Sequence, residues 1–321
     1  MRLKKPTWKK FSVMKVVDRR HFLATSLGTA GFAFGGLAAR GEKPAPPAKG
    51  TPSPDRPLLA RQPGEDDASF GRKLLAVEFL PPAQRKLALL FHHAYPGKLE
   101  GFQILDGVTR VGFRTLHGEI SDLIFEDGKA KTFEQREETP DLADTLHDSY
   151  PDRLSQGSWP ENFDPGRYRL DGFLKSIYGA SESEVAAQLV TVDFCGHKVR
   201  FNKNNRAADA LKAAGTELEA LKGKIPAIRP YLAELGGTFT WRPIAGTQRL
   251  SAHSYAIAID LNPELGGYWR WEKNGNPSDM DRRRKYPEEI VRVFEKHGFV
   301  WGGKWYHFDL MHFEYRPEFF A

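Results

Sequence analysis

Cysteine is nearly absent from this sequence of 321 residues, in which Cys195 is the only one. A single cysteine excludes a disulfide within the chain, so the fold has to be held together by its core. It also excludes a metal site built from several thiolates. Any metal ion would have to be bound by histidine and carboxylate side chains.

Long apolar runs and an excess of basic charge are also missing beyond the first 39 residues. The lack of apolar runs excludes a stable membrane span in that part. The formal net charge is +6, but residues 1–39 carry eight basic residues against the one acid Asp18, which is +7 and leaves about −1 for the rest. We therefore expect no nucleic-acid partner, because the near-neutral body offers no electrostatic footprint for one.

The extreme N-terminus resembles a twin-arginine export signal. In residues 18–24 (DRRHFLA), two arginines precede a variable residue and then Phe-Leu, and a Gly- and Ala-rich apolar stretch continues to Ala39. The glycines make a poor helix interior and a weak membrane span, which favours a cleaved signal peptide over an anchor. We predict a signal peptide over residues 1–39. The resemblance implies export in the folded state to the periplasm or the extracytoplasmic cell wall.

Residues 40–64, which follow the predicted signal, contain seven prolines among polar residues. This composition predicts an extended linker without packed structure. Residues 65–165 come next, as an N-terminal region to which the sequence assigns no role. Their patterns predict helices over about 70–95, one or two strands over 107–125 and then a charged, loop-rich stretch.

Helices and strands alternate irregularly in the C-terminal half, which predicts an α+β fold: a small antiparallel sheet with flanking helices, plus the N-terminal extension. A hairpin is expected over 190–201, with its bend at Gly196, and an amphipathic helix with one buried face begins at Asn205. The other predicted elements are a short helix over 226–235 that ends at Gly236-Gly237, a strand over 238–241, a strand over 256–259, a helix over 287–297 and a strand over 311–315.

Two polar patterns accompany the predicted strands. His253 and Asp260 are separated by a β-favouring run, and far downstream Asp309, His312 and Glu314 form the pattern Asp-x-x-His-Phe-Glu. A catalytic zinc ion needs three nitrogen or oxygen ligands and one open position. His253, Asp260 and His312 can supply two imidazoles and a carboxylate if the two strands lie side by side.

Taken together, the two patterns resemble the M15 family of zinc peptidases. That family includes D-alanyl-D-alanine carboxypeptidases, dipeptidases of the vancomycin-resistance type and L-alanyl-D-glutamate endopeptidases. The resemblance covers residues 190–316, and the segment 298–305 (GFVWGGKW) is most like the endopeptidase branch. It implies a zinc DD-peptidase-like core within a domain over residues 166–321. It also implies Zn²⁺ as the cofactor, with His253, Asp260 and His312 as its ligands.

The resemblance further implies roles for residues around the metal. Asp309 would act as general base toward a zinc-activated water molecule, and Arg242 would polarise the scissile carbonyl. Glu314 would hold a ligand histidine in place. The implied substrate contacts are Arg249, Ser251 and Trp305. Surface ion pairs remain the alternative for both arginines, and a core position remains the alternative for the tryptophan.

Two positions qualify this resemblance. His307 lies five residues before His312 and is the alternative third ligand, but only His312 has Asp309 three residues before it. Ala256 stands where the family commonly has glycine. If that position requires a positive φ, alanine strains the backbone; if it only requires a small side chain, nothing changes.

The expected function is hydrolysis of peptide bonds in the stem peptides of bacterial peptidoglycan, by an exported zinc metallopeptidase of the L-Ala-D-Glu endopeptidase type. The predicted compartment holds that substrate, so the signal and the site agree. A D-Ala-D-Ala carboxypeptidase is the first alternative. The second is a zinc-containing module that binds the cell wall without catalysis, and the presence of Asp309 and Arg242 weighs against it.

Overall fold

The computed structural model describes residues 58–244, 246–271 and 280–321. The chain divides into two units, Met1–Thr51 and Pro52–Ala321, and all described residues belong to the second. The predicted signal peptide over residues 1–39 therefore lies outside the described residues, as does the predicted linker up to residue 57. None of the described helices is long and apolar enough to cross a membrane.

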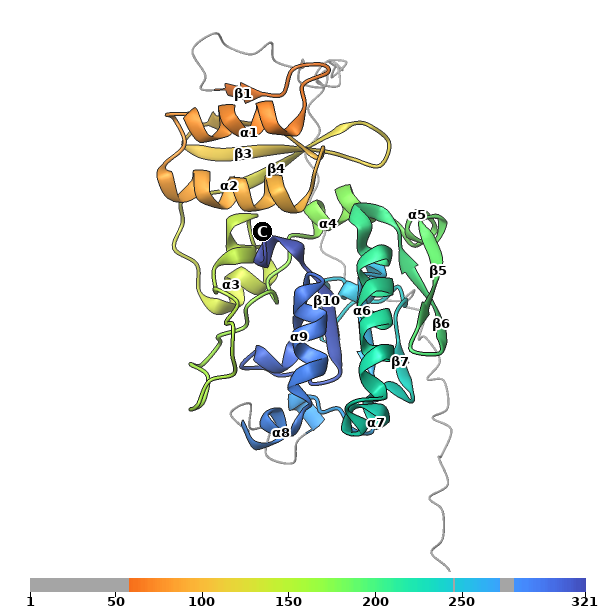
Figure 1. Ribbon diagram of the computed structural model, residues 1–321. Helices are drawn as coiled ribbons and strands as arrows, with labels where there is room; N and C mark the ends of the chain where they lie inside the picture. The colour runs from red at the N-terminus through yellow and green to blue at the C-terminus, as the bar shows by residue number, and fades with distance from the viewer. Residues whose placement is uncertain (1–57, 245, 272–279) are drawn as a thin grey trace, which may run out of the picture. The chain divides into compact units, whose positions relative to one another are not determined.

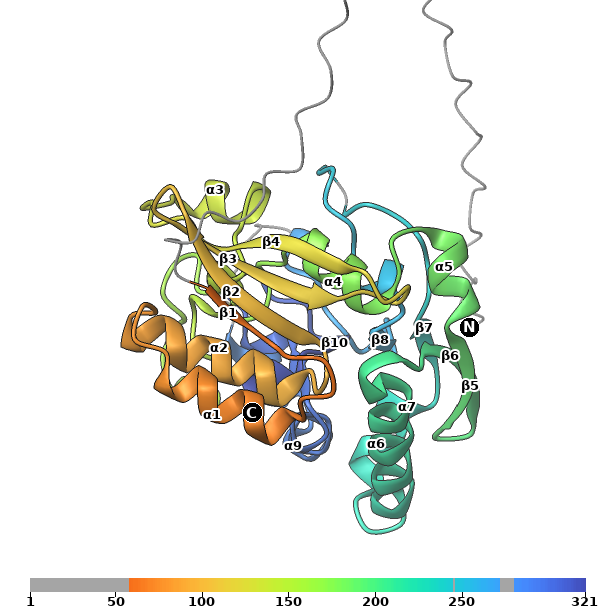
Figure 2. The same ribbon diagram turned by 90° about the horizontal axis from the view of Figure 1, so that it is seen from above.

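The first part of the described chain is an antiparallel sheet with two helices on one of its faces (Figures 1 and 2). Its strands, in spatial order, are β1 (Leu58–Ala60), β2 (Leu99–Leu105), β3 (Val108–Arg114) and β4 (Ile120–Glu126), and its helices are α1 (Asp67–Ala76) and α2 (Pro82–Ala94). Asp66 caps α1 by accepting a hydrogen bond from the amide of Ser69 at 2.6 Å. Pro82 starts α2, where its missing N–H costs nothing.

The end of the predicted linker belongs to this sheet, which corrects the prediction that residues 40–64 lack packed structure. Leu58–Ala60 pair with β2 as an edge strand. The side chain of Arg61 is largely covered, forms an ion pair with Asp67 at 2.7 Å and lies over the ring of Phe70 at 4.6 Å. The proline content of the linker does not indicate this strand, because its pairing partner β2 and the ion-pair partner Asp67 both lie later in the chain.

The second sheet is also antiparallel, and its spatial order is β7 (Leu235–Gly237), β8 (Ala258–Leu261), β10 (His312–Tyr315), β9 (Phe299–Trp301). Helices α6 (Ala207–Lys222) and α9 (Glu288–Lys296) lie side by side next to it (Figure 1). The hairpin β5 (Leu189–Phe194) and β6 (His197–Asn202) packs against α6. The remaining helices are α3 (Phe133–Glu138), α4 (Asp171–Tyr178), α5 (Glu182–Ala187), α7 (Arg229–Leu232) and α8 (Met280–Lys285).

The core behind the second sheet is aromatic. Helix α9 buries Ile290, Val293 and Phe294 on one face, and the Phe294 ring stacks on Phe313 of β10 with centroids 4.1 Å apart. All four residues of β10 are buried. Because β10 is held between β8 and β9 and backed by α9, side chains at its start have a rigid support.

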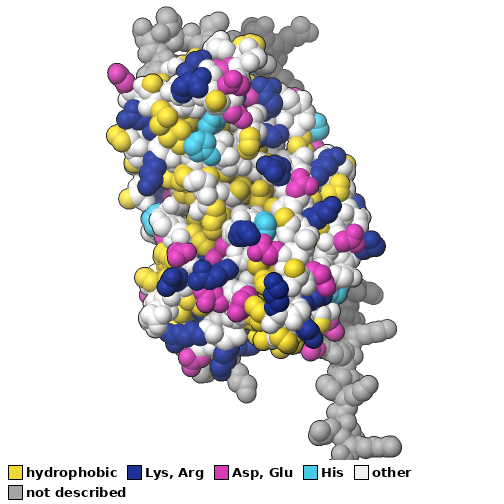
Figure 3. Space-filling model, in the orientation of Figure 1, with side chains coloured by type: hydrophobic (Ala, Val, Ile, Leu, Met, Phe, Trp, Pro, Cys, Tyr) yellow, Lys and Arg dark blue, Asp and Glu magenta, His cyan; other side chains and the backbone are white. Residues whose placement is uncertain are grey.

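The structure confirms the predicted α+β fold with small antiparallel sheets. The hairpin with its bend at Gly196, the amphipathic helix that buries Leu211 and Leu218, and the helix before Gly298 are all present. On the face shown in Figure 3, side chains of both charge signs lie interspersed, in agreement with the near-neutral net charge of this part of the chain.

Two predicted elements are shifted. The strand expected over 238–241 is instead β7, three residues earlier. Gly236 lies in that strand and does not end the predicted helix. A Cβ atom at this position would lie 2.8 Å from the Cβ of Asp260, which explains why the residue is glycine. The strand expected over 256–259 begins at Ala258, since residues 252–255 form a short 3-10 turn.

Candidate metal centre

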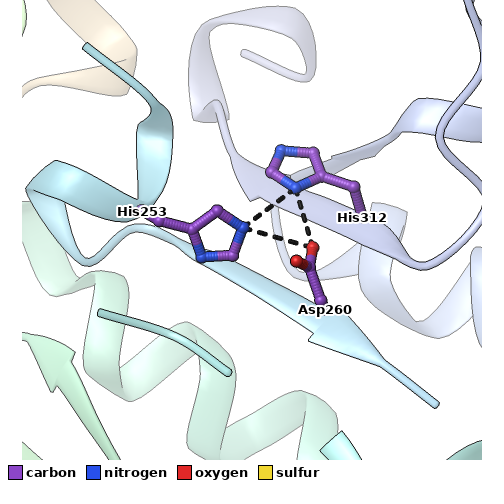
Figure 4. A group of neighbouring side chains, drawn as sticks. All are labelled: His253, Asp260 and His312. Carbon is purple, nitrogen blue, oxygen red and sulfur yellow. Dashed lines mark hydrogen bonds and ion pairs between the residues drawn. The ribbon is translucent and has the colours of Figure 1, made fainter. Parts of the chain in front are cut away.

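Three predicted ligands come from three different elements and meet on one face of the second sheet. Asp260 lies in β8 and His312 opens β10, and the two residues are direct cross-strand partners in the antiparallel register. Their side chains therefore point to the same side of the sheet. His253 reaches this place from the 3-10 turn Ala252–Tyr255 that precedes β8. Figure 4 shows the three side chains turned toward one another.

The ligand atoms form a small triangle. His253 Nε2 lies 3.3 Å from His312 Nδ1 and 3.2 Å from Asp260 Oδ1, and His312 Nδ1 lies 3.0 Å from Asp260 Oδ1. A tetrahedral zinc ion with bonds of about 2.0–2.2 Å places its ligand atoms roughly 3.3 Å apart. The triangle has nearly these edges, so its shape fits one small cation with a fourth position left open.

Hydrogen bonds on the far side of each imidazole fix which nitrogen is free to bind a metal. His253 Nδ1 donates to the carbonyl oxygen of Thr238 at 3.2 Å, an atom that can only accept. His312 Nε2 lies 3.4 Å from Glu314 Oε2 and donates to that carboxylate. With a metal ion bound, each ring would thus keep its proton on the outer nitrogen and turn the lone pair of its inner nitrogen toward the ion.

The charges in this cluster favour a bound cation. Burial opposes protonation of His312, but hydrogen bonds with Asp260 and Glu314 raise its pKa to about 10. Burial opposes ionisation of Asp260, yet the neighbouring His253 and His312 hold its pKa well below the usual carboxyl range. Without a metal the cluster holds a proton, for which a metal ion competes. Two imidazoles and a carboxylate form a ligand set that suits zinc.

The triangle lies in a cleft of about 340 Å³. Within the described ranges it is the single group of three or more histidine, cysteine or acidic side chains arranged to hold a metal ion. The other predicted site residues that line the cleft are Asp309, Arg242, Ser251 and Trp305. Arg249 and Glu314 are not among its lining residues.

Asp309, the predicted general base, is held in the cleft by a close backbone contact. Its amide donates to the carbonyl oxygen of Gly302 at 3.0 Å, and a side chain on Gly302 would come within 2.5 Å of the Asp309 carbonyl oxygen. Its Oδ1 is buried and has no hydrogen-bond partner among the described residues. Burial and the charge of Asp260 raise the pKa of Asp309 to about 7, a value suited to proton exchange at neutral pH.

The two predicted arginines have different surroundings. Arg242 is exposed at the wall of the cleft, and its guanidinium has no ion-pair partner in the part of the chain that the structure describes. Arg249 lies 3.3 Å from Glu137 and 3.4 Å from Glu138. The structure therefore brings Arg242 to the metal ligands and places Arg249 in the ion pairs that were its alternative.

Ser251 and Trp305 both have structural partners as well as a place in the cleft. Ser251 Oγ accepts from the amide of His253 at 3.4 Å, at the start of the 3-10 turn. The indole N–H of Trp305 donates to the carbonyl oxygen of Pro165 at 2.6 Å, and its ring centroid lies 5.6 Å from that of His312. The substrate contacts implied for both residues remain predictions.

His307, the alternative ligand, does not point into the triangle. Its Nδ1 lies 2.7 Å from Oδ2 of the buried Asp164, and its amide donates to the other oxygen of that carboxylate at 2.9 Å. The imidazole lines the cleft beside the metal cluster. Asp164 is thus a partner of the site that no sequence pattern indicated.

Ala256 adopts the left-handed conformation, with φ 52° and ψ 43°. This is the case in which the departure from glycine strains the backbone, at a cost of about 1 kcal/mol. The residue lies between the turn that carries His253 and the strand that carries Asp260, and its side chain is fully buried. The strain therefore falls on the connection between two of the three ligands.

Several cleft residues were not predicted. Arg167 and Arg169 come from the segment before α4, and the other unpredicted lining residues are Ile244, Tyr268, Trp271 and Met311. Arg167 and Arg169 lie 86 and 84 residues before His253, the first predicted ligand, and belong to no motif. Only a contact map would have found them, since no periodicity or spacing connects them to the metal ligands.

The comparison with known families agrees with this geometry. Residues 245–315 match a family model of the M15 peptidases that is described as D-alanyl-D-alanine carboxypeptidase. This match supports an M15 family peptidase. The matched segment contains His253, Asp260, His312 and Asp309, whereas Arg242 and Arg169 lie outside it. No curated protein and no solved structure matched the chain.

Proposed function

We propose that this protein is an exported zinc metallopeptidase that hydrolyses peptide bonds in the stem peptides of bacterial peptidoglycan. The family match supports peptidoglycan-related peptidase activity. The observation that carries the zinc proposal is the convergence of His253 Nε2, His312 Nδ1 and Asp260 Oδ1, with both outer nitrogens hydrogen-bonded. Such a cluster, to which the described residues contribute no lysine or arginine, suits a metal ion better than it suits a structural role.

Zinc held by these three side chains would supply a Lewis acid that lowers the pKa of a water molecule to about 7. Asp309 would accept a proton from the attacking water and return it to the amine that leaves. Its orphaned Oδ1 and its raised pKa support this role. Arg242 donates hydrogen bonds to the carbonyl oxygen as negative charge develops on it, for which its unpaired guanidinium is suited.

Two scissile bonds are candidates. The segment 298–305 favours the bond between L-alanine and D-glutamate, which is our first choice. The description of the matched family favours the terminal D-Ala-D-Ala bond. Mass spectrometry of digested muropeptides distinguishes them, because the first bond is internal to the stem and the second releases one terminal alanine.

The central experiment is an assay of the purified protein with defined muropeptides, with and without a zinc chelator. We expect cleavage that the chelator abolishes and added zinc restores. In Asp309→Asn, which keeps the size of the side chain, we expect retained zinc and a loss of activity of about 10²–10⁴-fold. Full activity of this variant would overturn the assigned base. Binding to cell-wall sacculi without any product would instead favour the non-catalytic alternative.

Export by the twin-arginine route is tested by cell fractionation. Replacing Arg19 and Arg20 together by lysine should leave the unprocessed protein in the cytoplasm, whereas the native chain reaches the periplasm. A matched control replaces Lys9 and Lys10 by glutamine, which removes two charges of the same N-terminus outside the motif. Equal export of all three proteins would contradict the proposed route.

A further inference from the structure

Arg169 reaches the candidate metal centre from outside the segment that matches the family. Its guanidinium makes a two-pronged contact with Glu314: Nε donates to Oε1 at 2.7 Å, and Nη2 contacts Oε2. Nη1 donates to the carbonyl oxygen of Arg167 at 3.2 Å. The guanidinium also lies over the Trp305 indole at 5.9 Å. The plane and position of the group are therefore fixed from several sides.

Glu314 connects Arg169 to His312, one of the predicted metal ligands. It follows His312 by two residues on β10, so both side chains lie on the same face of the strand. Glu314 is completely buried, and its Oε2 lies 3.4 Å from His312 Nε2. This distance is at the outer limit of a hydrogen bond, so a small displacement of the carboxylate would break the contact.

We propose that Arg169 is a positioning residue for the metal centre. It holds Glu314 against His312, which keeps the proton on Nε2 and the lone pair of Nδ1 turned toward His253 and Asp260. The matched segment alone would then be an incomplete site, because one of its ligands is oriented by a residue 145 positions away from Glu314. This inference rests on the zinc site of the proposed function and adds a residue to it.

The test is the zinc affinity of the full chain, measured by competition with a chromophoric chelator. Arg169→Met should weaken zinc binding about 10–100-fold, the usual effect of removing a partner of a ligand histidine. Arg61→Met is the matched control. The Arg61 side chain is 8% exposed against 7% for Arg169, and it too pairs with a carboxylate and covers an aromatic ring. We expect this control to keep the zinc affinity of the native chain.

A merely structural role makes a different prediction. It would lower the midpoint of thermal unfolding in both variants and leave zinc affinity unchanged in both. Arg169→Lys is a milder change, because lysine keeps the charge but cannot make the two-pronged contact with Glu314. The zinc affinity of this variant should lie between those of Arg169→Met and the native chain. The visible spectrum of the Co²⁺-substituted protein should also change in Arg169→Met and not in Arg61→Met, since it reports the ligand geometry.

The possible outcomes separate this inference from the proposed function. If the native chain does not bind zinc, the proposed function fails. If the native chain binds zinc and Arg169→Met binds it equally well, only the role of Arg169 is overturned. If Arg169→Met does not fold, the comparison of Arg169→Lys with Arg61→Lys decides in the same way: weaker zinc binding in the first alone supports the inference, and equal binding overturns it.

Discussion

Two clusters of polar side chains in this protein look alike and differ in one respect. In the segment around α3, the ammonium of Lys131 lies 2.7 Å from Asp141, 2.6 Å from Asp144 and 3.5 Å from Asp127. In the candidate metal centre, two imidazoles and a carboxylate also converge on a point, but no lysine or arginine among the described residues pairs with that carboxylate. A lysine of the chain completes the first cluster, whereas the second holds only a proton, which a metal ion can replace.

This difference separates a structural cluster from a functional one. Each carboxylate around Lys131 has a charged partner, so the cluster is satisfied by the chain itself. In the candidate metal centre both outer imidazole nitrogens have hydrogen-bond partners, and the inner ligand atoms point at one another. Asp309 Oδ1, beside them, has no hydrogen-bond partner among the described residues. Outer nitrogens that already have partners, around inner ligand atoms that converge in a cleft beside an unpartnered carboxylate oxygen, point to a bound ligand.

The largest expected effect comes from removing a ligand. His312→Ala should reduce zinc affinity by at least about a hundredfold, more than the loss of an outer partner, and activity should fall with it. The metal-free protein should keep its fold, because the core behind β10 is aromatic and does not depend on the imidazole. Zinc titration and circular dichroism check both statements. Native zinc affinity in this variant would mean that the metal binds elsewhere.

The second largest effect is expected on stability, from a change in the Lys131 cluster. Lys131→Met leaves three carboxylates without their central charge, so we expect the free energy of unfolding to fall by about 3 kcal/mol. Zinc affinity should stay at the native level. Lys129→Met is the control, since that side chain is 78% exposed and lies 4.0 Å from Asp127, and it should change stability by less than about 0.5 kcal/mol. Denaturant titration measures both variants, and equal stabilities would remove the contrast between the two clusters.

A third prediction uses pH. Asp164 is buried, which disfavours its charge, but His307 and Arg167 lower its pKa below the ordinary 3.8. A carboxyl with a lowered folded-state pKa stabilises the fold above its unfolded pKa, and this contribution is lost as the pH falls through the folded value. Asp164→Asn should therefore be less stable than the native chain at pH 7, and the difference should shrink below about pH 4. A difference that does not vary with pH would contradict the ion-pair account.

The smallest effect is expected at Ala256. Ala256→Gly relieves the left-handed strain of about 1 kcal/mol, but it adds unfolded-state entropy of similar size and removes a buried methyl group. The net change in unfolding free energy should lie within roughly 0.5 kcal/mol, while zinc affinity stays the same or rises slightly. A large loss of stability would show that the methyl group matters more for packing than the backbone strain does.

The convergence of His253, Asp260 and His312 could be predicted from the sequence, because the family resemblance and the expected strand pairing both indicate it. Asp260 follows a β-favouring run and His312 opens the next strand of the pattern, so a pairing of β8 with β10 brings them together. Backbone strain at Ala256 could also be anticipated from the local sequence, and the positive φ of this residue shows that the strain is present. These features depend on residues near one another in the chain, or on two strands that the hydrophobic pattern marks.

The rest depended on contacts that no local pattern encodes. Arg169 meets Glu314 across 145 positions, and Asp164 meets His307 across 143. The edge strand β1 was missed because proline content describes the chain locally, while β2 provides the pairing partner. The sequence predicts a helix stop at Gly236, whereas in the structure its lack of a side chain allows the close approach of β7 to Asp260.

The most direct test of the metal centre is anomalous X-ray diffraction at the zinc edge from crystals of the zinc-loaded protein. We predict a single strong peak about 2.0–2.2 Å from His253 Nε2, His312 Nδ1 and Asp260 Oδ1. A peak at another place in the molecule, or the three side chains hydrogen-bonded to one another with no peak between them, would contradict the account.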